Sequence, residues 1–215
     1  MITAIIFDMN GVITDDEDCH ELATQKAFDQ VDIAITPEIY RKYCLGRPDI
    51  TAFEELMAEF QIKGKTTEDL ISVKTSFYLE LIKDNLKIYP GVVGLIRRLH
   101  NNYTLALTTS STCNEVETVM TQLDIGGLFK TIVTAEDVKN GKPDPEPYLL
   151  TAEKLGVKSE DCLVIEDSEN GVKSAKSAGM KCIAITNSEH PDKLQLADRI
   201  IGQYSEITQP FLQSL

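Results

Sequence analysis

The sequence predicts an α/β protein built on a doubly wound parallel sheet, with a helical block inserted after the first strand. Three observations lead to this prediction. Short apolar runs rich in β-branched residues recur along the chain, and they are nearly continuous, as in strands covered on both faces. Segments of helical periodicity separate these runs, which is the alternation that produces a parallel sheet. One long segment near the N-terminus has helical patterns and no convincing strand.

Six apolar runs are predicted to form the strands, and the last of them is the weakest: residues 3–7, 104–108, 131–134, 162–165, 181–186 and 199–201. Two clear helices lie between the runs. Apolar residues at i, i+3, i+4 and i+7 mark them: Val92, Leu95, Ile96 and Leu99, then Val116, Val119, Met120 and Leu123. Pro90 and Gly91 precede the first of these helices, and Pro145 suits the first turn of a third.

The helical block spans residues 15–87, so the core is predicted to comprise residues 1–14 and 88–215. A block inserted at this point should lie over the carboxyl ends of the strands, where open α/β sheets bind ligands. We therefore expect a cap over a site, with hinges near residues 14–18 and 86–90. A fixed helical layer with no lid role is the alternative.

Charge and cysteine content narrow the class of protein. The 215-residue chain has a formal net charge of -13, which disfavours nucleic acid and anionic membranes as partners. An anionic small substrate would need local positive charge. The 5 cysteines include no C-x-x-C pair, and no apolar stretch approaches the length of a membrane span. We expect a cytoplasmic, monomeric protein with reduced thiols.

Polar side chains follow the first two predicted strands at the point where each strand ends. Asp8 comes directly after the first run, as a nucleophile, a metal ligand or a helix cap. Gly11 permits a tight backbone after it. Thr109 and Ser110 are the first residues past the second run, where hydroxyls and free N–H groups suit phosphate oxygens. A plain helix cap by Ser110 or Ser111 is the alternative.

Two later segments place further charges at the same edge of the sheet. Lys142 lies between Gly141 and Pro143, in a rigid loop before a predicted helix. Glu166 and Asp167 end the fourth predicted strand, so their carboxylates should face Asp8. Like charges in such proximity repel unless a cation lies between them. The three acids therefore predict an oxygen-rich site for a hard divalent ion.

These motifs, in this order, resemble those of the haloacid dehalogenase superfamily of phosphohydrolases. The resemblance covers nearly the whole chain and is strongest to the branch with a helical cap, which contains β-phosphoglucomutase and many sugar-phosphate phosphatases. The four family motifs and the cap exit correspond to "DMNGVITDDE", Thr109, Lys142 in its K-P context, Glu166-Asp167 and "YPGV".

The resemblance implies a two-step phosphoryl transfer on a small phosphorylated metabolite. Asp8 would attack phosphorus and form an aspartyl phosphate, which water then opens. Mg²⁺ would be bound by Asp8, the backbone carbonyl of Asn10, Asp167 and, directly or through water, Glu166. Lys142, Thr109 and Ser110 would hold the phosphoryl oxygens. Lys142 and Mg²⁺ would supply the local positive charge that an anionic substrate needs in an acidic protein.

Asn10 departs from the family pattern, which has a second Asp there as acid and base. An amide forms hydrogen bonds but exchanges no proton at neutral pH, so we expect a loss of roughly 10²–10⁴-fold in proton-transfer catalysis. Four explanations remain open: an engineered variant, a natural slow enzyme, a substrate whose leaving group needs no acid, or a non-catalytic phosphoester binder. Because the other motifs are intact, we favour a phosphatase altered only at this point.

Specificity should come from the cap. Gly46 and Arg47 are expected to face the core, with Arg47 as a clamp for a distal phosphate or carboxylate. His20 corresponds to a histidine of β-phosphoglucomutases. The mutase pattern places its cap arginine slightly later than Arg47, after a serine, whereas this chain has Pro48 and Asp49 there. Hydrolysis is therefore favoured over a phosphotransferase activity.

Two other readings of the motifs are less well supported. A signalling receiver also combines a doubly wound sheet with a phosphorylated Asp, a hydroxyl and a Lys, but it lacks a large cap. The "GKT" segment at residues 64–66 is not a phosphate-binding loop, since Glu59 occupies the position of the required first glycine.

Overall fold

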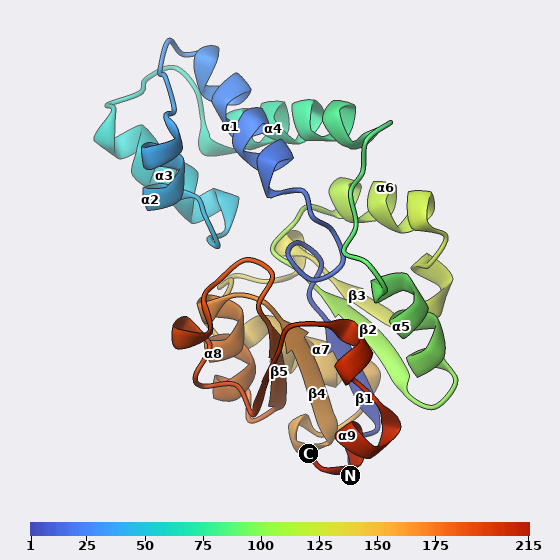
Figure 1. The fold of residues 1–215 in the computed structure, drawn as a ribbon. Coiled ribbons are helices and arrows are strands. Elements are labelled where there is room, and N and C mark those ends of the chain that lie inside the picture. Colours follow the sequence, from blue (N-terminus) through green and yellow to red (C-terminus); the bar gives the residue numbers. More distant parts are fainter.

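The computed structural model describes residues 1–215 and contains one six-stranded parallel sheet with the order β3-β2-β1-β4-β5-β6 (Figure 1). The predicted α/β fold and all six strands are confirmed, with ends that shift by at most one residue. The strands are β1 Ala4–Phe7, β2 Thr104–Thr108, β3 Thr131–Val133, β4 Cys162–Glu166, β5 Lys181–Ile185 and β6 Arg199–Ile201.

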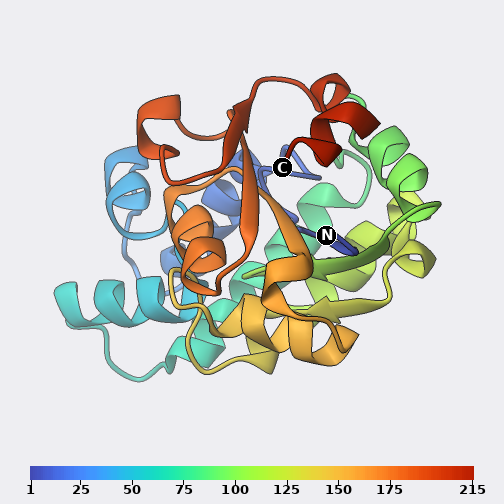
Figure 2. The same ribbon diagram turned by 90° about the horizontal axis from the view of Figure 1, so that it is seen from below.

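Helices cover both faces of this sheet. The α-helices of the core are α5 Val92–His100, α6 Cys113–Leu123, α7 Glu146–Leu155, α8 Glu169–Ser177 and α9 Gln209–Gln213. Short 3-10 helices are η1 Gly126–Leu128, η2 Ala135–Asp137, η3 Ser159–Asp161, η4 Pro191–Lys193 and η5 Tyr204–Glu206. Figure 2 shows the sheet between α5 and α6 on one side and α7 and α8 on the other.

The two apolar cores follow from the alternation of side chains along each strand. Ile5 and Phe7 of β1 pack in the larger core, which includes the buried faces of α5 and α6. Ala4 and Ile6 point the other way, into a smaller core with Tyr148 of α7. Burial on both faces explains why the strands read as continuous apolar runs.

Four helices lie between β1 and α5: α1 Glu17–Asp29, α2 Pro37–Tyr43, α3 Asp49–Glu59 and α4 Thr67–Ile82. We call them the inserted helices. They have an apolar cluster of their own, in which the rings of Phe28 and Phe53 meet edge to face at 4.9 Å. Figure 1 shows them beyond the carboxyl ends of the strands, with α4 beside α6 of the core, where Lys74 Nζ lies 3.1 Å from Glu115 Oε1.

The chain enters and leaves the inserted helices side by side. The backbone N–H of Asp15 donates to the carbonyl of Lys87 at 3.0 Å, and that of Tyr89 donates to Ile13 at 3.2 Å. The helices also touch the core, because Asn170 Nδ2 donates to the Gly46 carbonyl at 3.0 Å. The two chain segments that join the core to the inserted helices are therefore hydrogen-bonded to each other. The inserted helices also contact the core.

None of the helices combines the length and the apolar character needed to cross a membrane. All five cysteines are free thiols.

Candidate active site

Asp8 lies at the centre of the site, directly after β1. Its backbone N–H donates to the carbonyl of Ile165 at 3.1 Å, which continues the sheet pairing for one residue. Its carboxylate Oδ1 lies 2.8 Å from Nζ of Lys142. Burial raises the pKa of Asp8 to about 7, against the opposing effect of Lys142. The next helix begins only at Glu17, so the helix-cap interpretation of Asp8 is wrong.

Gly11 allows the loop after Asp8 to pass very close to β4. Its φ is 76°, in the left-handed region. A Cβ at this position would lie 1.8 Å from Oδ2 of Asp167, so no side chain fits without displacing that carboxylate. The glycine thus brings the first and fourth motifs into contact.

Lys142 is buried and has three oxygen partners. Nζ lies 2.8 Å from Asp8 Oδ1, 2.6 Å from Glu166 Oε1 and 3.3 Å from the carbonyl of Thr108. Burial opposes the charge, but Asp8 and Glu166 outweigh it and raise the pKa of Lys142. The ammonium group is therefore held charged and fixed in position beside the carboxylate of Asp8.

Glu166 is fully buried, and both of its carboxylate oxygens accept hydrogen bonds. Oε1 accepts from Lys142 and from the Tyr148 hydroxyl at 2.9 Å. Oε2 accepts from the backbone N–H groups of Asp167 and Ser168 and from the Ser168 hydroxyl. Burial raises the pKa of Glu166, but Lys142 and these donors outweigh it and lower it overall. Gly171 leaves space for this carboxylate, since a Cβ there would lie 1.7 Å from Oε1.

Carboxylate oxygens of Asp8, Glu166 and Asp167 all lie within 4.8 Å of one another. Burial, then Glu166 and Asp8, raise the pKa of Asp167 well above its usual range. A divalent cation would relieve this repulsion, so the donor set fits Mg²⁺. No backbone N–H donates to the carbonyl of Asn10, which leaves that oxygen available to a cation.

The side chain of Asn10 is held on both sides. Oδ1 accepts from Ser111 Oγ at 2.5 Å and from Thr109 Oγ1 at 3.5 Å. Nδ2 lies 3.2 Å from both carboxylate oxygens of Asp16 and 2.9 Å from Nε2 of His20. Because an amide nitrogen only donates, Nε2 of His20 accepts in this contact. The amide oxygen thus faces hydroxyl donors and the amide nitrogen faces acceptors, so the hydrogen bonds favour one orientation of the amide.

Two of the residues that hold Asn10, Asp16 and Ser111, were missed by sequence reasoning. Asp16 is buried and also accepts a hydrogen bond from the hydroxyl of Tyr78. The ring of His20 stacks on Tyr78 with centroids 4.1 Å apart. The acid-rich "TDDED" segment and the "TTSS" run were the available signals, but neither indicates which acid or hydroxyl turns inward.

Thr109, Ser110 and Ser111, which follow β2, line the pocket. The Thr109 hydroxyl accepts from the backbone N–H of Ser111 at 3.1 Å, and Ser110 lies between them on the pocket wall. Helix α6 is capped by Thr112, which forms a capping box with Glu115. The interpretation of Ser110 or Ser111 as the helix cap is therefore wrong.

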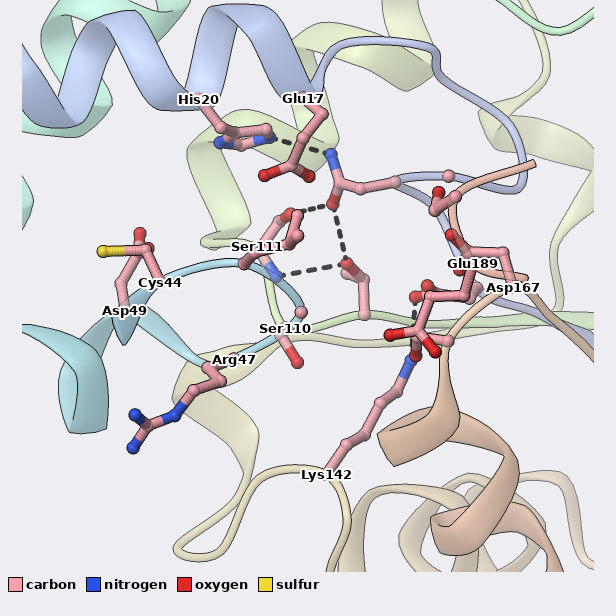
Figure 3. Close-up of a pocket in the computed structure, with 18 of the residues that line it drawn as sticks. Glu17, His20, Cys44, Arg47, Asp49, Ser110, Ser111, Lys142, Asp167 and Glu189 are labelled. Atoms are coloured by element: carbon pink, nitrogen blue, oxygen red, sulfur yellow. Dashed lines mark hydrogen bonds and ion pairs between the residues drawn. The ribbon is translucent and has the colours of Figure 1, made fainter. Parts of the chain in front are cut away.

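The inserted helices supply the opposite wall, which includes His20, Gly46 and Arg47. Arg47, however, forms two hydrogen bonds with Glu55, at 2.6 and 2.9 Å. Figure 3 shows its guanidinium group turned away from Lys142 and Asp167. In this structure Arg47 has a partner already and offers no free charge to a ligand.

The model of the haloacid dehalogenase-like hydrolase family matches residues 5–185. The chain belongs to this family. It is 35% identical over 184 residues to a phosphorylated carbohydrates phosphatase of Thermotoga maritima, which covers 84% of this chain and 83% of that protein. It is 30% identical to the β-phosphoglucomutase of Bacillus subtilis, over 95% of this chain and 91% of that protein.

Among solved structures of this haloacid dehalogenase-like fold, CbbY from Rhodobacter sphaeroides in complex with phosphate superposes with a TM-score of 0.87. The two sequences are 25% identical, and the superposition covers 99% of this chain and 100% of the CbbY chain. The family match and the relatives that are named as phosphatases identify this chain as a phosphoric monoester hydrolase of the family.

Proposed function

We propose that this protein is a magnesium-dependent phosphatase that hydrolyses a small organic phosphate of the sugar type through an aspartyl phosphate. One observation carries the proposal: the Asp8 carboxylate is buried between the ammonium group of Lys142, at 2.8 Å, and the carboxylate of Asp167 at the carboxyl edge of the sheet. A buried carboxylate in this position can attack an anionic phosphoryl group only if positive charge surrounds both.

Each residue at the sheet edge has a distinct role in the proposal. Asp8, Asp167 and the carbonyl of Asn10 would hold Mg²⁺, whose charge would neutralise the phosphoryl oxygens. Because both oxygens of Glu166 already accept hydrogen bonds, we assign it the positioning of Lys142, with contact to the metal only through its neighbours. Lys142 would stabilise the phosphoryl group from the other side.

The hydroxyl edge would bind the remaining phosphoryl oxygens. Thr109 and Ser110 line the pocket where β2 ends, and Ser111 is turned toward Asn10. Asp8 would then displace the leaving oxygen and become the aspartyl phosphate, which water opens in the second step.

Asn10 limits both steps in this account. It neither protonates the leaving oxygen nor removes a proton from water, so turnover should be roughly 10²–10⁴-fold below that of the same site with an acid there. The hydrogen bonds that hold its side chain also support an alternative, a protein that binds phosphoesters and turns them over very slowly. A mutase-like phosphotransferase is a further alternative, supported by the likeness to β-phosphoglucomutase.

We further propose that residues 15–87 form a cap that excludes water from the reacting groups. The paired crossings near Asp15 and Tyr89 would act as the hinge, and the contact between Gly46 and Asn170 would mark the closed position. His20, Gly46 and Arg47 would then lie on the side of the leaving group.

The proposed function is tested by the release of p-nitrophenol from p-nitrophenyl phosphate with and without Mg²⁺. We expect turnover that needs Mg²⁺ and is lost in Asp8→Asn, which changes one atom of the carboxylate. Turnover that persists in Asp8→Asn or in excess chelator would contradict the proposal, and no turnover of any ester would favour the binding alternative.

A further inference from the structure

We propose that the substrate is the monophosphate of a neutral, hydroxyl-rich molecule, and that this pocket discriminates against leaving groups that carry a second anion. The inference rests on the proposed phosphatase activity and concerns the wall opposite Lys142. It follows from the partners of the charged side chains on that wall.

The first cation on this wall, Arg47, is fully engaged by Glu55. Its two terminal nitrogens each bond one oxygen of the carboxylate, at 2.9 and 2.6 Å. The two side chains are 29% and 53% exposed, so the pair contributes little to stability, but its bidentate geometry holds the guanidinium group in one orientation. Glu55 does not line the pocket, so the pair draws the positive charge away from a ligand rather than toward it.

The second cation, Lys74, is engaged by two acids at once. Its Nζ lies 2.8 Å from Asp49 and 3.1 Å from Glu115, and the Lys74 and Glu115 side chains are 3% and 0% exposed. Burial opposes its charge, but Asp49 and Glu115 raise the pKa of Lys74. An incoming anion would have to displace a carboxylate from a buried pair, which costs a large part of the energy of that pair.

The remaining charges on the wall are acids. Glu17 accepts a hydrogen bond from the hydroxyl of Tyr40 at 2.5 Å, and it lines the pocket together with Asp49. Figure 3 shows Glu17 beside His20 on the inserted helix α1. A further acid, Glu189, lines the pocket from the core side, after β5. No cation on this wall lacks an acidic partner.

These groups favour one chemistry in the leaving group. A second phosphate or a carboxylate would lose its hydration and meet carboxylates, with no free cation to pair with. Hydroxyl groups would instead donate to Glu17 and Asp49, since carboxylates accept several hydrogen bonds. The positive charge of the site is confined to Lys142 and the proposed metal, which serve the phosphoryl group that is transferred.

The test compares kcat/KM within two matched pairs of esters. Glycerol 3-phosphate is paired with 3-phosphoglycerate, which replaces a hydroxymethyl group by a carboxylate, and glucose 6-phosphate is paired with glucose 1,6-bisphosphate. We expect the neutral member of each pair to be preferred at least about tenfold, which corresponds to about 1.4 kcal/mol. A smaller or reversed preference in either pair would overturn the inference while leaving the phosphatase intact.

The role of the pair between Arg47 and Glu55 is tested by replacing Glu55. Glu55→Gln releases the guanidinium group, so kcat/KM for the anionic members should rise about tenfold while that for the neutral members stays constant. Glu54→Gln, on the same helix and exposed, removes the same charge without touching Arg47 and should change neither. If Glu55→Gln leaves the preference unchanged, the inference fails. Absence of turnover of every ester, including p-nitrophenyl phosphate, would instead contradict the proposed function itself.

Discussion

Nζ of Lys142 lies 2.6 Å from Oε1 of Glu166, and both side chains are almost completely withdrawn from solvent. The same nitrogen contacts Asp8, so Glu166 fixes the distance between the cation and the proposed nucleophile. Its other oxygen is anchored by the backbone at the start of α8. The position of Lys142 is therefore set by the core of the protein and not by the ligand.

Replacing Glu166 by Gln should weaken the fold as well as catalysis. The buried ammonium group would lose one of two charged partners, and losses of this kind cost about 3–5 kcal/mol. Urea denaturation measures the change in the free energy of unfolding. Glu160→Gln is the control, because Glu160 forms only an exposed pair with Lys158 and should cost less than about 1 kcal/mol. Equal effects of the two variants would show that Glu166 does not anchor the site.

Removing the negative charge of Asp167 should abolish Mg²⁺ binding. Asp167→Asn retains the shape of the side chain but deprives the cluster of one of two carboxylates with oxygens free for a cation. Calorimetric titration with Mg²⁺ should show no heat of specific binding. Asp84→Asn, which removes an exposed acid far from the site in sequence, is the control for net charge. Unchanged affinity in Asp167→Asn would exclude Asp167 as a ligand.

Mg²⁺ affinity should depend on pH in a defined direction. Burial raises the pKa of Asp8 to about 7, so the carboxyl binds a proton below that value and loses it as pH rises through it. The proton and the metal compete, so the apparent affinity should increase from about pH 6 to about pH 8, by up to about tenfold per unit for each proton released. The same calorimetric titration at the two pH values measures this. An affinity that stays constant or falls as pH rises would contradict a protonated Asp8.

Substitution of Asn10 by Asp should restore acid–base catalysis. With an alkyl phosphate, whose leaving group needs a proton, we expect kcat to rise by about 10²–10⁴-fold. The gain should be smaller with p-nitrophenyl phosphate, a better leaving group. The new carboxyl would lie beside Asp16, and repulsion between the two acids favours retention of a proton by the pair.

Asn10→Ala is the matched control, since it also breaks the contacts with Asp16 and Ser111 but supplies no acid. Mass spectrometry of the peptide around Asn10 should accompany the assay, because an Asn-Gly sequence deamidates and a converted minority would contribute activity. Unchanged turnover of every ester in Asn10→Asp would show that the missing acid is not the limitation.

The fold was predictable because its signals are local. Strands buried on both faces must be apolar throughout, and the sheet edge is marked by the abrupt change to polar residues at Asp8 and Thr109. Most motif residues named from the sequence, including Asp8, Lys142 and Asp167, line one pocket in the structure, whereas Glu166 is fully buried and does not line it. Parallel topology alone brings strand ends together, so this convergence follows from the order of the strands.

Pairing between side chains was not predictable in the same way. Arg47, in the segment before α3, meets Glu55 of that helix only because the chain turns back along it, and Lys74 meets Glu115 only when α4 packs on α6. Such contacts depend on helix orientation, which the periodicity of apolar residues defines only coarsely. For the same reason the sequence did not show which acid of its N-terminal cluster would hold Asn10.

The central claim, that Asp8 is the nucleophile, is tested most directly by chemical trapping of its phosphorylated form. The protein is mixed with Mg²⁺ and a sugar phosphate, quenched, and reduced with borohydride, which converts an aspartyl phosphate to homoserine. We predict homoserine at position 8, dependent on Mg²⁺ and substrate and abundant because Asn10 slows the second step. Release of phosphate with no modification at position 8, or with modification of another residue, would contradict the account.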